Sequence, residues 1–108
     1  MNLHEVSPFR QKVYEACQRI PEGKVTTYKH LASEIACNSS QAIGQALRHN
    51  PFAPEVPCHR VVKTDRSLGG FYGETAGEVF NQKKALLEKE GVAFDAQERV
   101  NEACIYAF

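Results

Sequence analysis

The chain has 108 residues, and its 13 lysines and arginines balance its 13 aspartates and glutamates, so its formal net charge is zero. This length suits one domain, which we expect to span residues 1–108. The composition, 43% hydrophobic and 24% charged, excludes a disordered chain, and no apolar run approaches the roughly 20 residues of a membrane span. Zero net charge excludes a protein that wraps DNA by bulk electrostatics, so any DNA binding depends on a local patch.

The N-terminal residues 1–10 lack the apolar stretch of a signal peptide. We therefore expect an intracellular protein, cytoplasmic in a bacterium or nuclear in a eukaryote. Cysteines in such compartments are reduced, so we expect thiols rather than disulfides at Cys17, Cys37, Cys58 and Cys104.

Apolar side chains recur at helical spacing across residues 7–19, where Ser7 is placed to cap the helix and Pro8 to occupy its first turn. A turn at residues 21–24 and a short β-branched stretch at 25–27 follow. That stretch is too brief to predict a full strand.

Two short amphipathic segments, residues 28–36 and 40–49, are separated by three polar residues. This is the pattern of a helix-turn-helix, whose second helix enters a DNA groove. Gly44 near the middle of the second helix costs about 1 kcal/mol relative to alanine. Close packing between helices and close approach to a narrow groove both explain a glycine there.

Three prolines in residues 50–57 predict an extended, rigid connection, and residues 61–63 predict a strand. The glycines of residues 68–73 do not have a phosphate-binding spacing. A last helix is expected over residues 80–90, ended by a glycine, with a final short strand at 92–94. The predicted fold class is mostly α (α+β), a winged helix-turn-helix-like DNA-binding domain with a small β element.

Cys58 lies in the run Pro57-Cys58-His59-Arg60, and a cysteine is nucleophilic only as its thiolate. Imidazole and guanidinium neighbours favour that form. In extended chain, however, Cys58 and His59 point to opposite sides, so proton transfer needs a turn or a bridging water. A carboxylate must also orient the imidazole, and spacing alone does not select it among the thirteen acids.

Two different roles for this cysteine stay open. It is an ordinary packed thiol beside an incidental histidine, or it contributes to a zinc site with His59, Cys37 and His49. The absence of any CxxC or HxxxH pair argues against zinc.

The run PCHRVV at residues 57–62 resembles the active-site signature of the O6-alkylguanine-DNA alkyltransferases. Four further blocks in the same order also resemble this family. They are GKVTTY at 23–28, IGQALRHNP at 43–51, GFYG at 70–73 and the last helix at 83–91. The resemblance extends over most of the chain, roughly from Phe9 to Phe94.

The resemblance implies that Cys58, His59 and Glu90 form a hydrogen-bonded relay through a water. Cys58 would take the alkyl group from guanine O6 in one displacement and become a thioether. The reaction would be single-turnover, with no cofactor and no metal. Asn50 would link the recognition helix to the active-site loop.

The family also implies roles in handling the base. Tyr28 would hydrogen-bond the flipped base and help rotate its phosphate, and Lys83 with the backbone of Tyr72 would support the leaving oxygen. The pocket would be lined by Val61, Phe71, Tyr72 and Gly73. Plainer alternatives are a helix cap for Asn50, a core position for Tyr28 and a solvated face for the charged side chains.

Members of this family bind the minor groove with a recognition helix of small residues, and this suits a protein that scans any sequence. The residues expected at DNA are Tyr28, Gln41, Ala42, Gly44, Gln45 and Arg48. Lys29 is a further candidate for a phosphate contact, or simply a surface charge.

The chain departs from the family at three positions. Gln41 stands where the family has an arginine that fills the space left by the flipped base. Glutamine is shorter and uncharged, so it would stabilise the flipped state less. Phe71 stands where many members have tyrosine, and Glu74 where a second glycine is common.

The first functional hypothesis is therefore a DNA-repair methyltransferase acting on double-stranded DNA that contains O6-alkylguanine, as a monomer. The alternative is a non-enzymatic alkyltransferase-like protein, which binds the lesion and passes it to nucleotide excision repair proteins. Such proteins replace the nucleophilic cysteine, so the presence of Cys58 favours the enzyme. A winged-helix transcription factor with an incidental cysteine is a third hypothesis.

Overall fold

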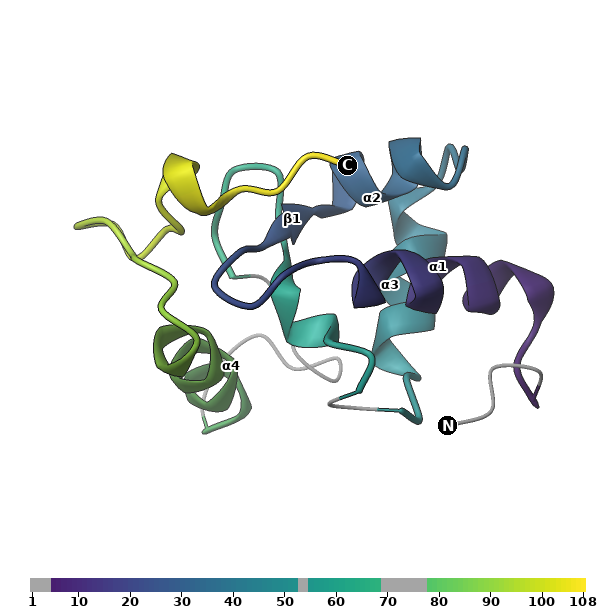
Figure 1. Cartoon of the computed structure of the whole chain (residues 1–108), viewed down its shortest axis with the longest axis horizontal. Coiled ribbons are helices and arrows are strands. Elements are labelled where there is room, and N and C mark those ends of the chain that lie inside the picture. Colours follow the sequence, from purple (N-terminus) through teal and green to yellow (C-terminus); the bar gives the residue numbers. More distant parts are fainter. Residues whose placement is uncertain (1–4, 53–54, 69–77) are drawn as a thin grey trace.

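The structure, a computed structural model, describes residues 5–52, 55–68 and 78–108. Its helices are α1 (Pro8–Gln18), α2 (Tyr28–Glu34), α3 (Ser40–Arg48) and α4 (Glu78–Lys89), and its strands are β1 (Thr26–Thr27) and β2 (Val61–Val62). The strands pair in parallel, with Thr26 opposite Val61. Figure 1 shows α1, α2 and α3 gathered at one end of the molecule and α4 at the other, with the strands between them. The predicted α+β class is confirmed.

The first helix begins as its sequence predicts. The Ser7 side chain accepts a hydrogen bond from the Arg10 amide, and Pro8 occupies the first turn. Its inner face is completely buried, and the hydroxyl of Tyr14 on this face donates to the carbonyl of Ala46 in α3 at 2.7 Å. This bond ties α1 to the second helix of the helix-turn-helix.

The helix-turn-helix is present, but both of its helices are shorter than expected. Helix α2 ends at Glu34 because Ala36 takes a left-handed conformation with φ 55°, which a continuing helix does not allow. Helix α3 then begins at a Ser39 cap that accepts from the Ala42 amide, and ends at Arg48. The turn directs α3 across α1 and α2 (Figure 1).

Residues 50–57 were expected to be extended, and this prediction is wrong for the part that the structure describes. The Val56 amide donates to the Phe52 carbonyl at 3.0 Å, so the segment folds back as a turn. The side chain of Asn50 organises this turn through hydrogen bonds to both of these residues. Three prolines indicate that the backbone of this segment is restricted, but they do not predict whether the segment extends or turns back.

The final strand expected at residues 92–94 is also not formed. Phe94 makes one isolated antiparallel bridge with Val100, and between them the Asp95 carboxylate accepts from the amides of Gln97 and Arg99 in a tight turn. Because the Asp95 side chain accepts hydrogen bonds from these backbone amides, they do not need a neighbouring strand as a hydrogen-bond partner.

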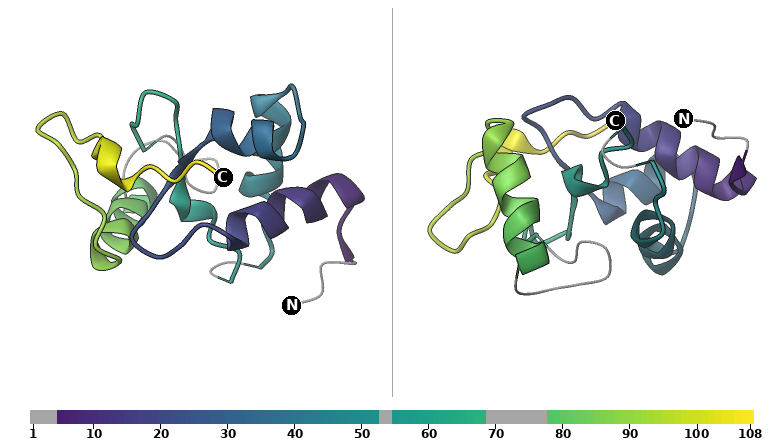
Figure 2. Two further views of the ribbon diagram at one scale, coloured as in Figure 1. Left: turned by 45° about the horizontal axis from the view of Figure 1, so that its top comes forward. Right: turned by 90° about the horizontal axis from the view of Figure 1, so that it is seen from below.

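The C-terminal segment instead pairs beside β1, which the sequence did not predict. The Val25 amide donates to the Cys104 carbonyl at 2.9 Å, and Val25 bridges Ile105 in parallel. Beyond them, Tyr106 and Phe108 pack against the core of α1–α3, and the second view in Figure 2 shows this segment returning toward α1. None of the helices in the described residues is long and apolar enough to cross a membrane.

Candidate active site and DNA interface

Cys58 begins a short 3-10 turn, η2 (Cys58–Arg60), that leads directly into β2. Its amide donates to the Val56 carbonyl at 2.8 Å, and the Arg60 amide donates to the Pro57 carbonyl. The segment is therefore a turn and not an extended chain, and a turn is one of the two arrangements that proton transfer between Cys58 and His59 was expected to need. Cys58 is 7% exposed and belongs to the core cluster of α1–α3.

Asn50 holds the approach to this turn. Its side-chain amide donates to the Val56 carbonyl at 2.9 Å, and its side-chain oxygen accepts from the Phe52 amide at 2.8 Å. The same side chain also favours the ionised form of the Cys58 thiol and so lowers the pKa of Cys58. A buried asparagine that spans the end of α3 and the residues before the cysteine is more than a helix cap.

His59, Arg60 and Glu90 form one cluster at the end of α4. The His59 Nε2 lies 2.9 Å from Glu90 Oε2, and Arg60 grips the same carboxylate with Nε at 2.9 Å and Nη2 at 2.8 Å. Arg60 Nη1 also donates to the Ile20 carbonyl just after α1. The structure thus selects Glu90 from the thirteen acids and adds Arg60, whose contact with Glu90 the sequence did not reveal.

The protonation of this cluster follows from its surroundings. Burial favours the neutral carboxyl of Glu90, but the hydrogen bonds and charges of Arg60 and His59 outweigh it and hold the pKa of Glu90 below its ordinary value. An ionised carboxylate only accepts, so His59 carries its proton on Nε2. Burial lowers the pKa of His59, so the ring is neutral at pH 7 and its Nδ1, which then carries no hydrogen, is the nitrogen that can accept a proton.

Lys83 of α4 is almost completely buried, at 1% exposure. Its ammonium donates to the carbonyls of Val61 at 2.9 Å and Leu68 at 2.6 Å, which brackets the segment after the reactive turn. Burial lowers the pKa of Lys83 to about 8. A solvated position for this lysine is therefore wrong.

Opposing effects act on the pKa of the Cys58 thiol. Burial raises the pKa of Cys58 above its ordinary value, while the hydrogen bond from Asn50 and the charge of Lys83 lower it. The net shift is upward, so the resting group is a thiol. Nucleophilic attack consequently requires a base, and the neutral imidazole of the next residue in the chain, His59, is the candidate.

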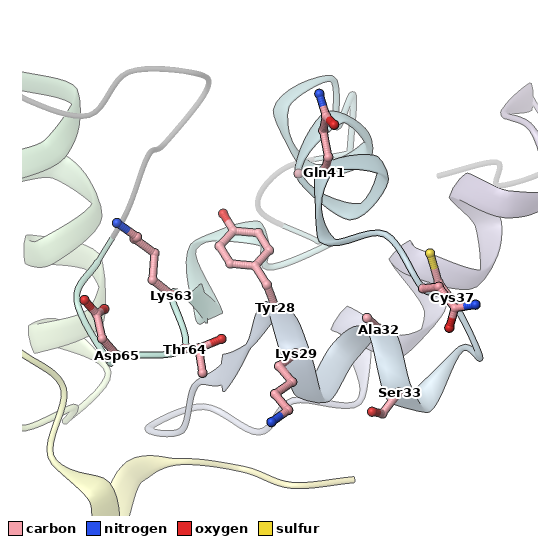
Figure 3. A pocket seen from close by; sticks show the side chains of 11 residues that line it. Tyr28, Lys29, Ala32, Ser33, Cys37, Gln41, Lys63, Thr64 and Asp65 are labelled. Atoms are coloured by element: carbon pink, nitrogen blue, oxygen red, sulfur yellow. The ribbon is translucent and has the colours of Figure 1, made fainter.

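A cleft of about 710 Å³ lies between the helix-turn-helix and the loop that follows β2. Figure 3 shows the Tyr28 ring standing in it, with Lys63 to one side and the α3 helix that carries Gln41 to the other. Gly44 also lines the cleft. Cys58 is not among the described lining residues, but Tyr28 packs against the core cluster that contains it.

Tyr28 therefore lies between the cleft and the thiol. Burial raises its pKa, and the nearby Cys58 adds to this shift, so the phenol keeps its proton at neutral pH. Tyr28 is partly exposed at the start of α2, where it presents a hydrogen-bond donor to whatever occupies the cleft.

The α3 residues expected at DNA share the outer side of the helix. Gln41, Gln45 and Arg48 are exposed, and Ala42 and Gly44 are partly exposed. Lys29 and Lys63 add positive charge at the cleft. Lys63 was missed in the sequence, where a single lysine after a strand carries no signal.

Gly44 is not required by packing within the chain. No heavy atom of the described residues lies within 4 Å of the position that a Cβ would occupy there. Close packing between helices therefore does not account for this glycine. The remaining explanation is that another molecule, such as DNA, approaches the helix closely at this position.

Further expected site residues are less informative. Val61 is fully buried in the core behind η2, and residues 71–73 lie outside the described part of the chain. Among the residues that the structure describes, no group of three histidines, cysteines or acids could hold a metal, so the alternative zinc site is not assembled.

The fold and site together define a helix-turn-helix domain. Its second helix is followed by Asn50, whose side chain holds the turn before Cys58, and the next residue, His59, contacts Glu90. Residues 8–92 match the family described as "6-O-methylguanine DNA methyltransferase, DNA binding domain". The chain belongs to this family.

Individual relatives agree. The methylated-DNA–protein-cysteine methyltransferase of Saccharolobus islandicus is 42% identical over 79% of this chain and 52% of its own length. The Mycobacterium tuberculosis OGT structure in complex with DNA has a TM-score of 0.70 and 39% identity, covering 80% of this chain and 51% of that one. The chain spans about half the length of the curated relatives it matches.

A structure of similar size also matches. S. pombe Atl1, in complex with damaged DNA containing O6-carboxymethylguanine, has a TM-score of 0.74 and 27% identity, and the match covers 98% of both chains.

Proposed function

We propose that this protein repairs DNA by taking the alkyl group of O6-alkylguanine onto Cys58 in a single, irreversible turnover. The observation that carries the proposal is that His59, the residue next to the buried Cys58 in the chain, has a neutral ring that Glu90 orients at 2.9 Å. A site that only bound the lesion would have no use for a nucleophilic thiol followed in the chain by an imidazole that a carboxylate orients.

The proposed displacement balances without a cofactor. The thiol proton passes to His59 Nδ1, directly or through one water, and the sulfur then attacks the alkyl carbon. A sulfur–carbon bond forms while the carbon–O6 bond breaks, and its electron pair stays on guanine. Guanine gains one proton, equal to the one that the thiol released. Lys83, whose charge lies near the sulfur, favours the thiolate that this step needs.

The cleft beside Tyr28 is the proposed path of the damaged strand. Lys29 and Lys63 outweigh the Asp65 carboxylate in the cleft and leave it a local positive charge, and the partly exposed Gly44 permits a close approach. Relatives crystallised with DNA support this partner class. Gln41, at the rim of the cleft, is the candidate to stand in for the flipped base.

A second candidate is a lesion-binding protein without transfer activity, which presents alkylated guanine to excision repair proteins. Two observations favour it: the match to Atl1 over 98% of both chains, and glutamine at position 41, which weakens the case for efficient base flipping. This second candidate function does not explain why Glu90 orients the ring of His59.

One experiment separates the two candidates. The protein is mixed with duplex DNA containing one O6-methylguanine, and binding is followed by anisotropy while the protein mass is measured intact. We expect the mass to rise by one methyl group per chain, and no rise for Cys58→Ser. Lesion binding without a mass change would establish the second candidate and refute the first.

Gly44→Ala tests the proposed groove contact. The added methyl meets no described atom and restores helix propensity, so the free energy of unfolding should rise by about 1 kcal/mol in urea titrations. Affinity for duplex DNA should fall, because the methyl would separate the two surfaces. Gly91→Ala is the matched control: it also has space for a Cβ, but its φ of +94° makes alanine strained, so it should destabilise the fold. Stronger or unchanged DNA binding by Gly44→Ala would contradict this contact.

A further inference from the structure

Arg60 is the least explained charged group at the site. Its side chain is 16% exposed, and three of its nitrogens bond within the protein. Two of them hold both oxygens of Glu90, and the third holds the Ile20 carbonyl. This geometry is the two-pronged contact in which a guanidinium fixes the plane of a carboxylate, which a lysine does not reproduce.

The position of Arg60 links three parts of the fold. It belongs to η2 with Cys58, it reaches Glu90 at the end of α4, and it reaches the carbonyl of Ile20 beyond α1. Glu90 Oε2 receives both Arg60 Nη2 and His59 Nε2. The carboxylate is thereby shared between a permanent cation and the imidazole.

This sharing has an electrostatic consequence. A buried carboxylate with no other partner would bind imidazolium more tightly than imidazole, and the ring would hold its proton. A second positive charge on the same carboxylate offsets that attraction and repels a proton on the ring. The ring then rests neutral, as a proton acceptor must.

We propose that Arg60 is a positioning residue, which fixes the Glu90 carboxylate for His59 and keeps the imidazole neutral so that it can receive the Cys58 proton. This role deepens the proposed alkyl transfer and rests on it for its purpose. The protonation of His59 itself is independent of any DNA reaction.

The other charged or titratable groups around η2 do not account for the neutral state of His59 in place of Arg60. From α4 the ring faces Glu90 and the ammonium of Lys83, whose effect on His59 is weaker than that of Arg60. From α1, Tyr14 and Cys17 lie near the thiol, and burial raises the pKa of each, so both are neutral. Arg60 is thus the cation that touches Glu90 directly.

The test follows the titration of His59 by NMR in protein labelled with nitrogen-15 at histidine. In Arg60→Met the midpoint should move to higher pH than in the wild type, because the remaining Glu90 charge favours imidazolium. Arg60→Gln, which keeps a donor without the charge, should move it in the same direction. Arg60→Lys should lie between wild type and Arg60→Met. Arg19→Met, which removes an exposed arginine paired with Glu34, should leave the midpoint unchanged.

Alkyl transfer gives the second readout. Arg60→Met should be roughly tenfold slower than wild type at pH 6 and approach it by pH 9, where the ring is neutral in both proteins. A purely structural role would slow transfer by the same factor at every pH and leave the His59 midpoint in place, and that result would overturn the inference. If the midpoint shifts while the wild-type protein transfers no methyl, the Arg60 effect stands and the proposed transferase function fails.

Discussion

Asn50→Ala is expected to lose most of its alkyl-transfer activity and a substantial part of its stability. The substitution leaves the Val56 carbonyl and the Phe52 amide without their present partner. The Val56 carbonyl keeps its bond from the Cys58 amide, so only the Phe52 amide is left unpaired, and the free energy of unfolding should fall by about 1–3 kcal/mol. The thiol also loses the hydrogen bond that stabilises its ionised form. Transfer rates on O6-methylguanine DNA and urea titrations measure the two effects.

Asn50→Asp separates the effect on the thiol from the effect on folding. It keeps an acceptor for the Phe52 amide, but it places a negative charge near Cys58 and offers no donor to the Val56 carbonyl. Transfer should be slow even at temperatures where the variant is fully folded. Normal transfer by a folded Asn50→Asp would show that Asn50 serves only as a cap.

Lys83→Met should slow alkyl transfer by about tenfold or more at pH 7, because it removes the buried cation that favours the thiolate. Without that charge the thiol requires a higher pH to ionise, so the deficit should narrow as the pH rises. Rates measured from pH 6 to pH 9.5 test this, and a deficit independent of pH would contradict the electrostatic role.

The stability of Lys83→Met provides a separate check with a defined sign. The pKa of Lys83 falls from 10.5 to about 8 in the folded protein, so between these values the unfolded chain binds more protons. Raising the pH through this window favours the folded state of the wild type. The free energy of unfolding of wild type minus that of Lys83→Met should therefore increase from pH 8 to pH 10.5.

The helices were predictable because their signals are local. Ser7 with Pro8 before α1 and Gly91 after α4 each act within one turn of the chain, and each lies where it was expected. The predicted end of α2 was wrong by two residues because Ala36, an ordinary helix former, takes a left-handed conformation that composition does not signal.

The site depended on contacts between distant segments, which periodicity does not report. Residue types near Cys58 suggested a thiolate, but the choice of Glu90 came from the family resemblance, and its 2.9 Å contact with His59 joins positions 31 residues apart. Arg60 was counted as a neighbour of the thiol, whereas its side chain grips Glu90. Lys83 was singled out only by the family resemblance, and its burial depends on the fold.

The central claim is that Cys58 itself receives the alkyl group, and peptide mass spectrometry tests it directly. The protein is reacted with duplex DNA carrying one O6-methylguanine whose methyl group is isotopically labelled, and is then digested. We expect one labelled methyl per chain, located on the peptide that contains Cys58, with guanine restored in the DNA. Label on Cys17, Cys37 or Cys104, or intact O6-methylguanine in DNA that the protein has bound, would contradict the account.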